Sequence, residues 1–295
     1  MGALLATTLS LLATLAPAPA PVTVAVLDTG VDVEQPALAS RLLERRDFVG
    51  TSALTQRPRP DGDPDDPLDG SGHGTAVTGV LASVAPNARF LGLRTCWDDD
   101  QCYQSVQAPA IDWAARRGAR VVSMSWLSGP LEPELRAAIV GHPDVLFVGI
   151  PSGNGQPYDA DPEDPEPCNL DAANVLCVST DCGAYGRHSV DVAVPTRGLV
   201  TTRNGGGSTT TACATSYAAP AAAGVAATLF GLHPDASASD VRRAILAGAR
   251  PAPAWRRRSV SGGVIDAEGA VAAIERAPRA SRSATATGPR TSASR

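Results

Sequence analysis

Residues 22–30 have the sequence Val-Thr-Val-Ala-Val-Leu-Asp-Thr-Gly, an apolar run rich in β-branched residues that ends in a carboxylate and a glycine. Such a run predicts a strand buried on both faces, and its polar end predicts a turn where the chain leaves the sheet. The next marked stretch is 69–75, Asp-Gly-Ser-Gly-His-Gly-Thr, which leads into a helical pattern over 76–84. Taken alone, Asp28 is interpreted as a turn residue and His73 as a helix-entry residue.

The same alternation continues along the chain and decides the fold class. Further strands are predicted at 48–49, 88–93, 121–125 and 145–150, and helices at 103–117, 132–140, 237–249 and from 262 to about 276. Alternating buried strands and helices predict an α/β fold with a mainly parallel sheet and helices on both faces. In such a sheet the functional groups gather at the carboxyl ends of the strands, which is where Asp28 and Asn154 fall.

A third stretch, Ala212–Pro220, supplies a hydroxyl. A Gly- and Thr-rich loop over 204–211 leads into Ser216, a helix of small residues follows at once, and Pro220 suits its first turn. A serine there lies beside unpaired backbone N–H groups at the positive end of the helix dipole, although a plain helix cap is the structural alternative. Together, Asp28, His73 and Ser216 provide the acid, base and nucleophile that acyl transfer needs.

With these motifs the chain resembles the subtilisin-like serine peptidases (subtilases, peptidase family S8). The similarity runs from about residue 22 to about residue 274. The matching residues are Asp28-Thr29-Gly30, Gly72-His73-Gly74-Thr75, Ser152-Gly153-Asn154 and Thr215-Ser216 with Ala218 and Pro220. The resemblance implies the three-layer subtilisin-like fold and a serine endopeptidase that hydrolyses peptide bonds through an Asp-His-Ser triad and an acyl-enzyme intermediate.

The resemblance also implies roles for further residues. The side-chain amide of Asn154 is expected to donate to the oxyanion, together with the backbone N–H of Ser216. Two segments are expected to pair with an extended peptide or protein substrate, the strand-addition mode of binding. Their substrate-binding residues are Ser123, Met124, Ser125, Trp126, Leu127, Ser152 and Gly153. This chemistry requires no cofactor.

Several residues depart from the family pattern. Trp126 and Leu127 stand where a Leu-Gly pair is common, Pro151 replaces a small residue, Ala214 replaces glycine and Tyr217 replaces methionine. A bulkier site leaves open the alternative of a catalytically weak or inactive module that binds peptides without cutting them. An α/β-hydrolase esterase is set aside, because that class has the residue order Ser, Asp, His and a Gly-x-Ser-x-Gly motif.

Length and composition bound the remaining possibilities. The chain has 295 residues, of which 43% are hydrophobic, enough for one large domain over residues 21–276. A net charge of −5 gives no reason to expect a nucleic-acid partner. Residues 277–295 are rich in Arg, Ser and Ala with little to bury, so this tail is predicted to be disordered. We expect a monomer with no stable membrane anchor.

The first 20 residues contain an apolar core over 4–15 followed by an Ala-Pro repeat. This pattern predicts a signal peptide and a secreted or periplasmic protein, with a short apolar N-terminal helix as the alternative. Subtilases usually carry an inhibitory segment before the catalytic part, and the stretch before Val22 is too short for one. We therefore expect either folding without that segment or a start codon further upstream.

Cysteines and aspartates raise two further expectations. An even number of cysteines in an exported chain favours disulfides, and six cysteines allow 15 pairings. Local closure favours Cys96–Cys102 and then Cys168–Cys177, which leaves Cys182–Cys213; buried free thiols are the alternative, and no zinc-type spacing accompanies them. Five aspartates within 61–69 offer oxygen ligands for Ca²⁺, with a solvated surface loop as the alternative, and no metal is assigned to the site.

Overall fold

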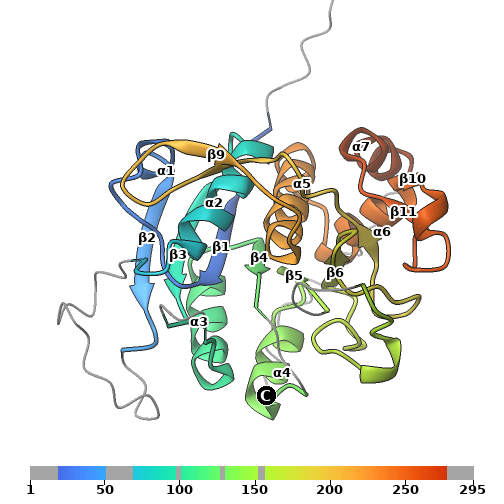
Figure 1. The fold of residues 1–295 in the computed structure, drawn as a ribbon, viewed down its shortest axis with the longest axis horizontal. Coiled ribbons are helices and arrows are strands. Elements are labelled where there is room, and N and C mark those ends of the chain that lie inside the picture. Colours follow the sequence, from blue (N-terminus) through green and yellow to red (C-terminus); the bar gives the residue numbers. More distant parts are fainter. Residues whose placement is uncertain (1–18, 51–68, 98–100, 127–129, 152–156, 278–295) are drawn as a thin grey trace, which may run out of the picture.

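The computed structural model describes residues 19–50, 69–97, 101–126, 130–151 and 157–277. Within them, a nine-stranded sheet has the order β10-β11-β7-β6-β5-β4-β1-β3-β2, and β8 and β9 form a separate hairpin (Figure 1). The strands are β1 (Thr23–Asp28), β2 (Leu42–Asp47), β3 (Arg89–Arg94), β4 (Val121–Met124), β5 (Leu146–Gly149), β6 (Val175–Ser179), β7 (Val192–Ala193), β8 (Val200–Thr202), β9 (Ser208–Thr210), β10 (Arg250–Pro251) and β11 (Gly263–Val264). Neighbours in the large sheet are parallel, except for the antiparallel pair β10 and β11.

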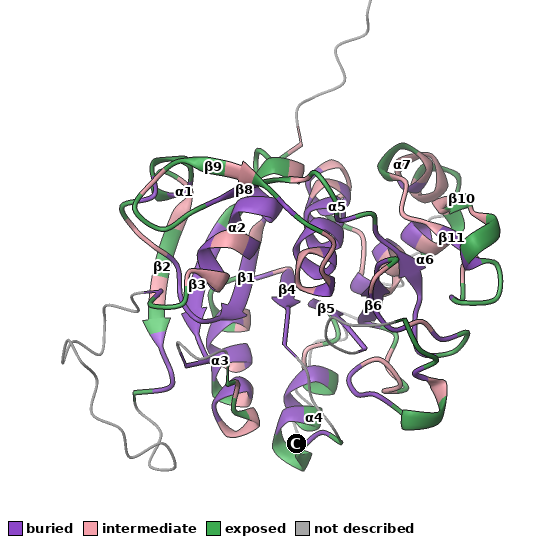
Figure 2. Cartoon of the chain, viewed as in Figure 1, coloured by how far each residue is buried: buried purple, intermediate pink, exposed green. Residues whose placement is uncertain are grey.

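Helices cover both faces of the sheet, which gives the three-layer α/β architecture. The helices are α1 (Pro36–Ala39), α2 (His73–Val84), α3 (Gln104–Arg116), α4 (Pro133–Gly141), α5 (Ala218–Leu232), α6 (Ala238–Gly248) and α7 (Ala267–Arg276), with short 3₁₀ turns η1 (Asp161–Glu163), η2 (Thr215–Tyr217) and η3 (Pro253–Trp255). Helices α2, α5 and α6 share one hydrophobic core with the sheet, and α3 and α4 share the other (Figure 2). The expected α/β fold class is confirmed.

Strand β1 shows why residues 24–27 are all apolar. It lies between β3 and β4, inside the sheet and third from the β2 edge. Val24 and Val26 pack into the core under α2 and α5, whereas Ala25 and Leu27 pack into the core under α3 and α4. Because a central parallel strand is covered on both faces, alternate residues meet different helices and all of them are apolar.

Most predicted elements agree with the structure to within a few residues, but the second strand does not. The prediction at 48–49 is wrong, because β2 is Leu42–Asp47 and ends just before Phe48. This strand lies at the edge of the sheet, and its Glu44 and Arg46 side chains are exposed. An edge strand with charged residues carries no clear apolar alternation, so the pattern points to the buried residues that follow it.

Two smaller corrections concern the segment before α5. The predicted loop over 204–211 contains β9, which pairs antiparallel with β8. Ser216 does not start a helix directly; it lies in the 3₁₀ turn η2, and α5 follows at Ala218. Pro220 falls in the first turn of α5 as expected, where its missing N–H costs no intrahelical hydrogen bond.

The cysteine pairing expected from local closure is confirmed. Disulfides join Cys96 to Cys102, Cys168 to Cys177 and Cys182 to Cys213, and none of the six cysteines is free. The alternative of buried thiols at Cys177 and Cys213 is therefore wrong.

Several expectations fall on residues outside the described ranges. They are the apolar segment up to residue 18, the aspartates at 61–66 and nearly all of the tail at 277–295. Among the helices that the structure describes, none has both the length and the apolar character needed to cross a bilayer.

Candidate active site

Asp28 is the last residue of β1 and is held in a nearly closed environment. Asp28 is only 2% exposed. Its Oδ1 accepts a hydrogen bond from the backbone N–H of Thr29 at 2.9 Å. Its backbone carbonyl accepts from the N–H groups of Thr95 and Cys96, at 2.8 and 3.1 Å. The loop after β3 therefore fixes the end of β1, and the carboxylate has little freedom to turn.

His73 is the first residue of α2 and faces this carboxylate. Its Nδ1 lies 2.7 Å from Oδ1 of Asp28. Because a carboxylate only accepts hydrogen bonds, the shared proton sits on Nδ1, and Nε2 is the basic nitrogen of the ring. Gly72 caps the helix with a φ of 82°, a left-handed conformation that glycine adopts without strain.

Asp69 ties the end of β1 to the start of α2. One of its carboxylate oxygens accepts from the Thr29 hydroxyl and from Gly72 N–H, both at 2.7 Å, and the other accepts from Thr75 N–H at 2.6 Å. The Thr29 hydroxyl oxygen accepts in turn from Gly74 N–H at 2.9 Å. Burial raises the pKa of Asp69, while these hydrogen bonds work in the opposite direction. This carboxylate therefore positions both Asp28 and His73.

Sequence analysis missed this role of Asp69. The aspartate run over 61–69 predicts calcium ligands or a solvated surface loop, whereas Asp69 is buried. The available signal was its place four residues before His73 in the same motif, where a carboxylate can accept from the first N–H groups of a helix.

Ser216 is presented by the turn η2 at the start of α5. The neighbouring Thr215 is fully buried, and a Cβ on Gly183 would come within 2.2 Å of the Thr215 side chain. The turn is therefore tightly packed against Gly183. The hydroxyl of Ser125 donates to the backbone carbonyl of Ser216 at 2.8 Å. The Cys182–Cys213 disulfide anchors the chain three residues ahead of Ser216.

One cavity of about 370 Å³ brings these groups together. Asp28, His73 and Ser216 all line it. The other lining residues are Thr29, Cys96, Gln101, Cys102, Ser125, Trp126, Ile150 and Thr215. A base held in one tautomer by a carboxylate, next to a hydroxyl in the same cavity, is an arrangement capable of nucleophilic acyl transfer.

The cavity contains only part of the predicted substrate-binding set. Ser125 and Trp126 line it, whereas Ser123 and Met124 are buried in β4 and do not. Leu127, Ser152, Gly153 and the expected oxyanion donor Asn154 lie outside the described residues. The disulfide Cys96–Cys102 and Gln101 form a wall that sequence analysis did not anticipate; the signal was that their loop follows β3, the neighbour of β1.

The unusual residues beside Ser216 fit the site without strain. Ala214 has φ −157° and ψ 142°, ordinary extended backbone that alanine adopts freely. Its N–H donates to the Thr196 hydroxyl at 3.2 Å. Tyr217 packs against the core under α2 and α5, and burial raises the pKa of its phenol. Neither side chain is one of the residues that line the described cavity.

The described residues give no support for a bound metal at this site. Within them, no group of three or more His, Cys, Asp or Glu side chains is arranged to hold a metal ion. Asp69, the described member of the aspartate run at 61–69, is engaged by Thr29, Gly72 and Thr75. The other aspartates of this run lie outside the described residues, so calcium binding there stays an expectation.

Known proteins resemble this chain in sequence. It is 29% identical over 220 residues to the thermophilic serine proteinase of Bacillus sp. (strain AK1), which covers 70% of this chain and 51% of that protein. It is also 29% identical over 221 residues to alkaline serine protease ver112 of Corniculantispora psalliotae, covering 70% and 53%. The chain thus spans about half the length of these curated relatives.

Solved structures resemble it in fold. The structure described as "Structural basis of subtilase cytotoxin SubAB assembly" superposes with a TM-score of 0.70 at 21% identity, covering 86% of this chain and 90% of that one. The prenylagaramide maturation protease PagA gives a TM-score of 0.66 at 22% identity, covering 86% and 93%. The model of the Subtilase family matches residues 20–269, well over half of the sequence, and so the chain belongs to the subtilase family.

Proposed function

We propose that this protein is a serine endopeptidase that cleaves peptide bonds in peptide or protein substrates, with Asp28, His73 and Ser216 as its catalytic residues. The observation that carries the proposal is the 2.7 Å contact between Nδ1 of His73 and Oδ1 of Asp28, at a cavity that Ser216 also lines. Membership of the subtilase family supports serine peptidase chemistry at this cavity.

The proposed reaction has two halves that use the same base. Asp28 orients the imidazole and stabilises its protonated form, and Nε2 of His73 takes the proton of the Ser216 hydroxyl as the oxygen attacks the peptide carbonyl. His73 then protonates the leaving amine, and the Ser216 oxygen remains bound to the acyl group. A water molecule, deprotonated by the same imidazole, releases the acid and restores the hydroxyl.

Charge on the carbonyl oxygen must be stabilised during both halves. The backbone N–H of Ser216 lies in η2, two residues before α5, at the positive end of that helix's dipole. We assign the second donor to the side-chain amide of Asn154, on the strength of the family motif. Removal of the equivalent donor in a subtilisin, the worked case for this effect, lowers kcat by about 10²–10³.

The proposal also covers the location of the enzyme and its oligomeric state. Three disulfides in one chain support an oxidising compartment, and so a secreted or periplasmic location. We propose that it acts as a monomer, and light scattering of the purified protein checks this by giving the mass of a single chain.

Digestion of fluorescently labelled casein tests the proposed activity. The wild type is expected to digest it, and Ser216→Ala to lose activity on the order of 10⁶-fold, the loss known for the same change in a subtilisin. Ser208→Ala removes an exposed serine in β9 and is the matched control, with unchanged activity expected. Equal digestion by wild type and Ser216→Ala would refute the proposal.

The same assay separates the other possibilities. A module that only binds peptides would retain labelled casein without producing fragments, in the wild type as well as in Ser216→Ala. Preincubation with EDTA examines the calcium expectation for residues 61–69, and loss of digestion only after chelation would establish a required ion.

A further inference from the structure

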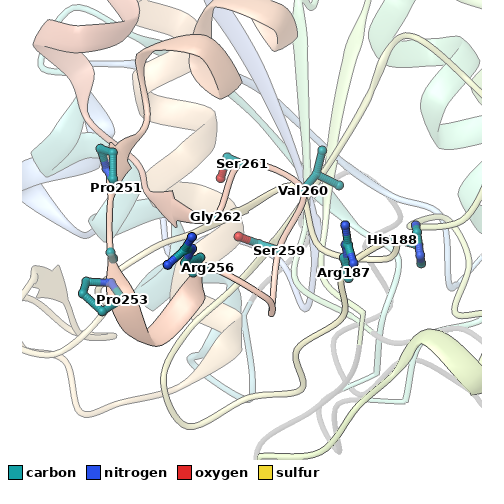
Figure 3. A pocket seen from close by; sticks show the side chains of 10 residues that line it. Arg187, His188, Pro251, Pro253, Arg256, Ser259, Val260, Ser261 and Gly262 are labelled. Atoms are coloured by element: carbon teal, nitrogen blue, oxygen red, sulfur yellow. The ribbon is translucent and has the colours of Figure 1, made fainter.

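A second cavity lies apart from the active site and has no assigned role. It has a volume of about 740 Å³ and is formed by Arg187 and His188 together with residues from 251 to 262 (Figure 3). None of its lining residues also lines the cavity that holds His73 and Ser216. Its size is within the range of ordinary small-molecule and peptide sites.

The walls of this cavity are basic. Figure 3 shows Arg187 and His188 on one side and Arg256 on the other. No acidic residue is among the residues that line it. Among the described residues, no carboxylate forms an ion pair with Arg187 or Arg256. Two guanidinium groups therefore face the cavity with no acid within it to balance their charge.

Nearby carboxylates are occupied by other partners. Asp161 accepts from the backbone N–H of His188 at 3.1 Å and from both N–H and hydroxyl of Ser189, at 2.8 and 2.7 Å. Asp181 accepts from Nε1 of Trp255 at 2.9 Å, beneath the turn that carries Arg256. These acids support the two walls and do not reach into the cavity as lining residues.

Ser259 gives an independent sign that a ligand belongs here. It lines the cavity although the residue is only 2% exposed, and its hydroxyl oxygen has no hydrogen-bond partner among the described residues. In Figure 3 it lies between the two basic walls. A buried hydroxyl without a partner is costly and rare in folded proteins, and an acceptor oxygen entering the cavity would satisfy it.

The segment that carries Ser259 is fixed before any ligand arrives. The N–H of Val260 donates to the Val190 carbonyl at 2.7 Å, and the N–H of Ser261 donates to the Asp191 carbonyl at 3.0 Å. Trp255, the residue before Arg256, is buried. The cavity thus includes residues of β10 and η3, and its Ser259 wall is tied to the segment just before β7, so binding would need little rearrangement.

From these features we propose that the cavity is an accessory binding site for an oxyanion, namely the carboxylate of an acidic peptide segment. Arginine forks suit a carboxylate or a phosphate, and the Ser259 hydroxyl supplies a donor between them. Pro251, Pro253 and Val260 add apolar surface at the same cavity, which favours an anion carried on a peptide chain over a free ion. Inorganic phosphate offers the same oxygens and serves as the second probe.

Isothermal titration calorimetry of the full chain tests this site, in the Ser216→Ala background so that peptides stay intact. The probes are a short capped oligoglutamate, its oligoglutamine counterpart and inorganic phosphate, at physiological ionic strength. Oligoglutamate is expected to bind and oligoglutamine is not. Arg187→Gln and Arg256→Gln should each weaken binding by about tenfold or more, since each removes a charge-assisted hydrogen bond.

Two further variants make the test specific. Arg257→Gln removes the same charge from the adjacent exposed residue, which does not line the cavity, and should leave affinity within about twofold. Ser259→Ala should weaken oligoglutamate binding by about three- to tenfold without lowering the melting temperature, because the hydroxyl has no partner to lose.

The outcomes separate cleanly. Binding of phosphate but not oligoglutamate would overturn the peptide assignment and make this a small-anion site. Equal losses in Arg257→Gln and Arg256→Gln, or no binding of any probe, would overturn the site itself. Because catalysis is abolished in the protein used, neither result depends on the proposed peptidase activity.

Discussion

At the scale of single residues, the proposed chemistry depends on side chains that never touch a substrate. The contact between His73 and Asp28 survives only if the end of β1 and the start of α2 keep their relative positions. The Asp69 carboxylate fixes that position through Thr29 on one side and Thr75 on the other. Asp69 is therefore a positioning residue for the triad.

Asp69→Asn should impair both stability and activity. One carboxylate oxygen becomes an NH₂ group, so a donor would face either the N–H of Thr75 or the N–H of Gly72. We expect a loss of about 1–3 kcal/mol in the free energy of unfolding and a lower kcat/KM, measured by urea denaturation and peptide hydrolysis. Asp266→Asn, which preserves the cap of α7, is the matched control. Wild-type values for Asp69→Asn would contradict this role.

The pKa of Asp69 gives the stability of the wild type a pH dependence that Asp69→Asn lacks. Burial raises the pKa of Asp69 in the folded state, so the folded protein holds this proton more tightly than the unfolded chain does. The resulting contribution to the free energy of unfolding is fully present below the unfolded pKa and is lost as pH rises through the folded pKa. In Asp69→Asn this decline of the free energy of unfolding with rising pH should be absent. Urea denaturation of both proteins across the acidic range measures the difference.

Ala214→Gly tests whether the departure from the family pattern matters for catalysis. Alanine already adopts the extended conformation found there, so the change should leave kcat/KM within about twofold. It should lower the free energy of unfolding by about 0.4–1 kcal/mol, because glycine gains freedom in the unfolded chain. A tenfold rise in kcat/KM would show instead that the alanine methyl hinders attack.

At the scale of elements, the approach of α2 to β1 sets the site. A Cβ on Gly74 would lie 2.0 Å from the carbonyl oxygen of Gly30, so a side chain here would force the helix away from the strand. The packing explains why glycine follows His73 directly. The sequence motif shows the glycine but does not show which backbone it approaches.

Gly74→Ala should therefore destabilise the fold by about 1–3 kcal/mol and lower kcat/KM by separating His73 from Asp28. Gly141→Ala is the matched control, because nothing lies within 4 Å of the added carbon. That control should be neutral or stabilising by about 0.5–1 kcal/mol, as for a helical glycine replaced by alanine. Thermal unfolding monitored by circular dichroism compares the two, and similar effects would disprove the close-approach argument.

Helix α6 offers a second test at this scale. Ser237 and Asp240 form a capping box, in which each side chain accepts from the backbone N–H of the other at 3.1 and 3.0 Å. Asp240→Ala should cost about 0.5–2 kcal/mol of the free energy of unfolding at neutral pH. Glu275→Ala, an exposed change in α7, should be near neutral.

The cost of Asp240→Ala should fade in acid. The Ser237 hydrogen bond lowers the pKa of Asp240 in the folded protein, so the stabilisation is present above the unfolded pKa and is lost as pH falls through the folded pKa. Denaturation of wild type and variant at decreasing pH should show the difference between them shrinking. A constant difference would mean that the carboxylate charge plays no part in the cap.

At the scale of the whole molecule, sequence patterns predicted the features that depend on which side chains are buried. They missed the features that depend on which segments lie next to one another in space. The α/β class, β1 and the ends of α3, α4 and α6 to within about one residue followed from the residue pattern. Strand β2 was misplaced because an edge strand has no apolar alternation. The role of Asp69 and the wall formed by Cys96, Gln101 and Cys102 depend on which segments meet in space, information that spacing along the chain does not contain.

The central claim is that folding makes one serine of this chain nucleophilic. Mass spectrometry of the protein after reaction with a fluorophosphonate measures this directly. We predict one adduct, on Ser216, that is absent from Ser216→Ala and His73→Ala and from the urea-unfolded wild type. No adduct on the folded wild type, or an adduct on a different serine, would contradict the account.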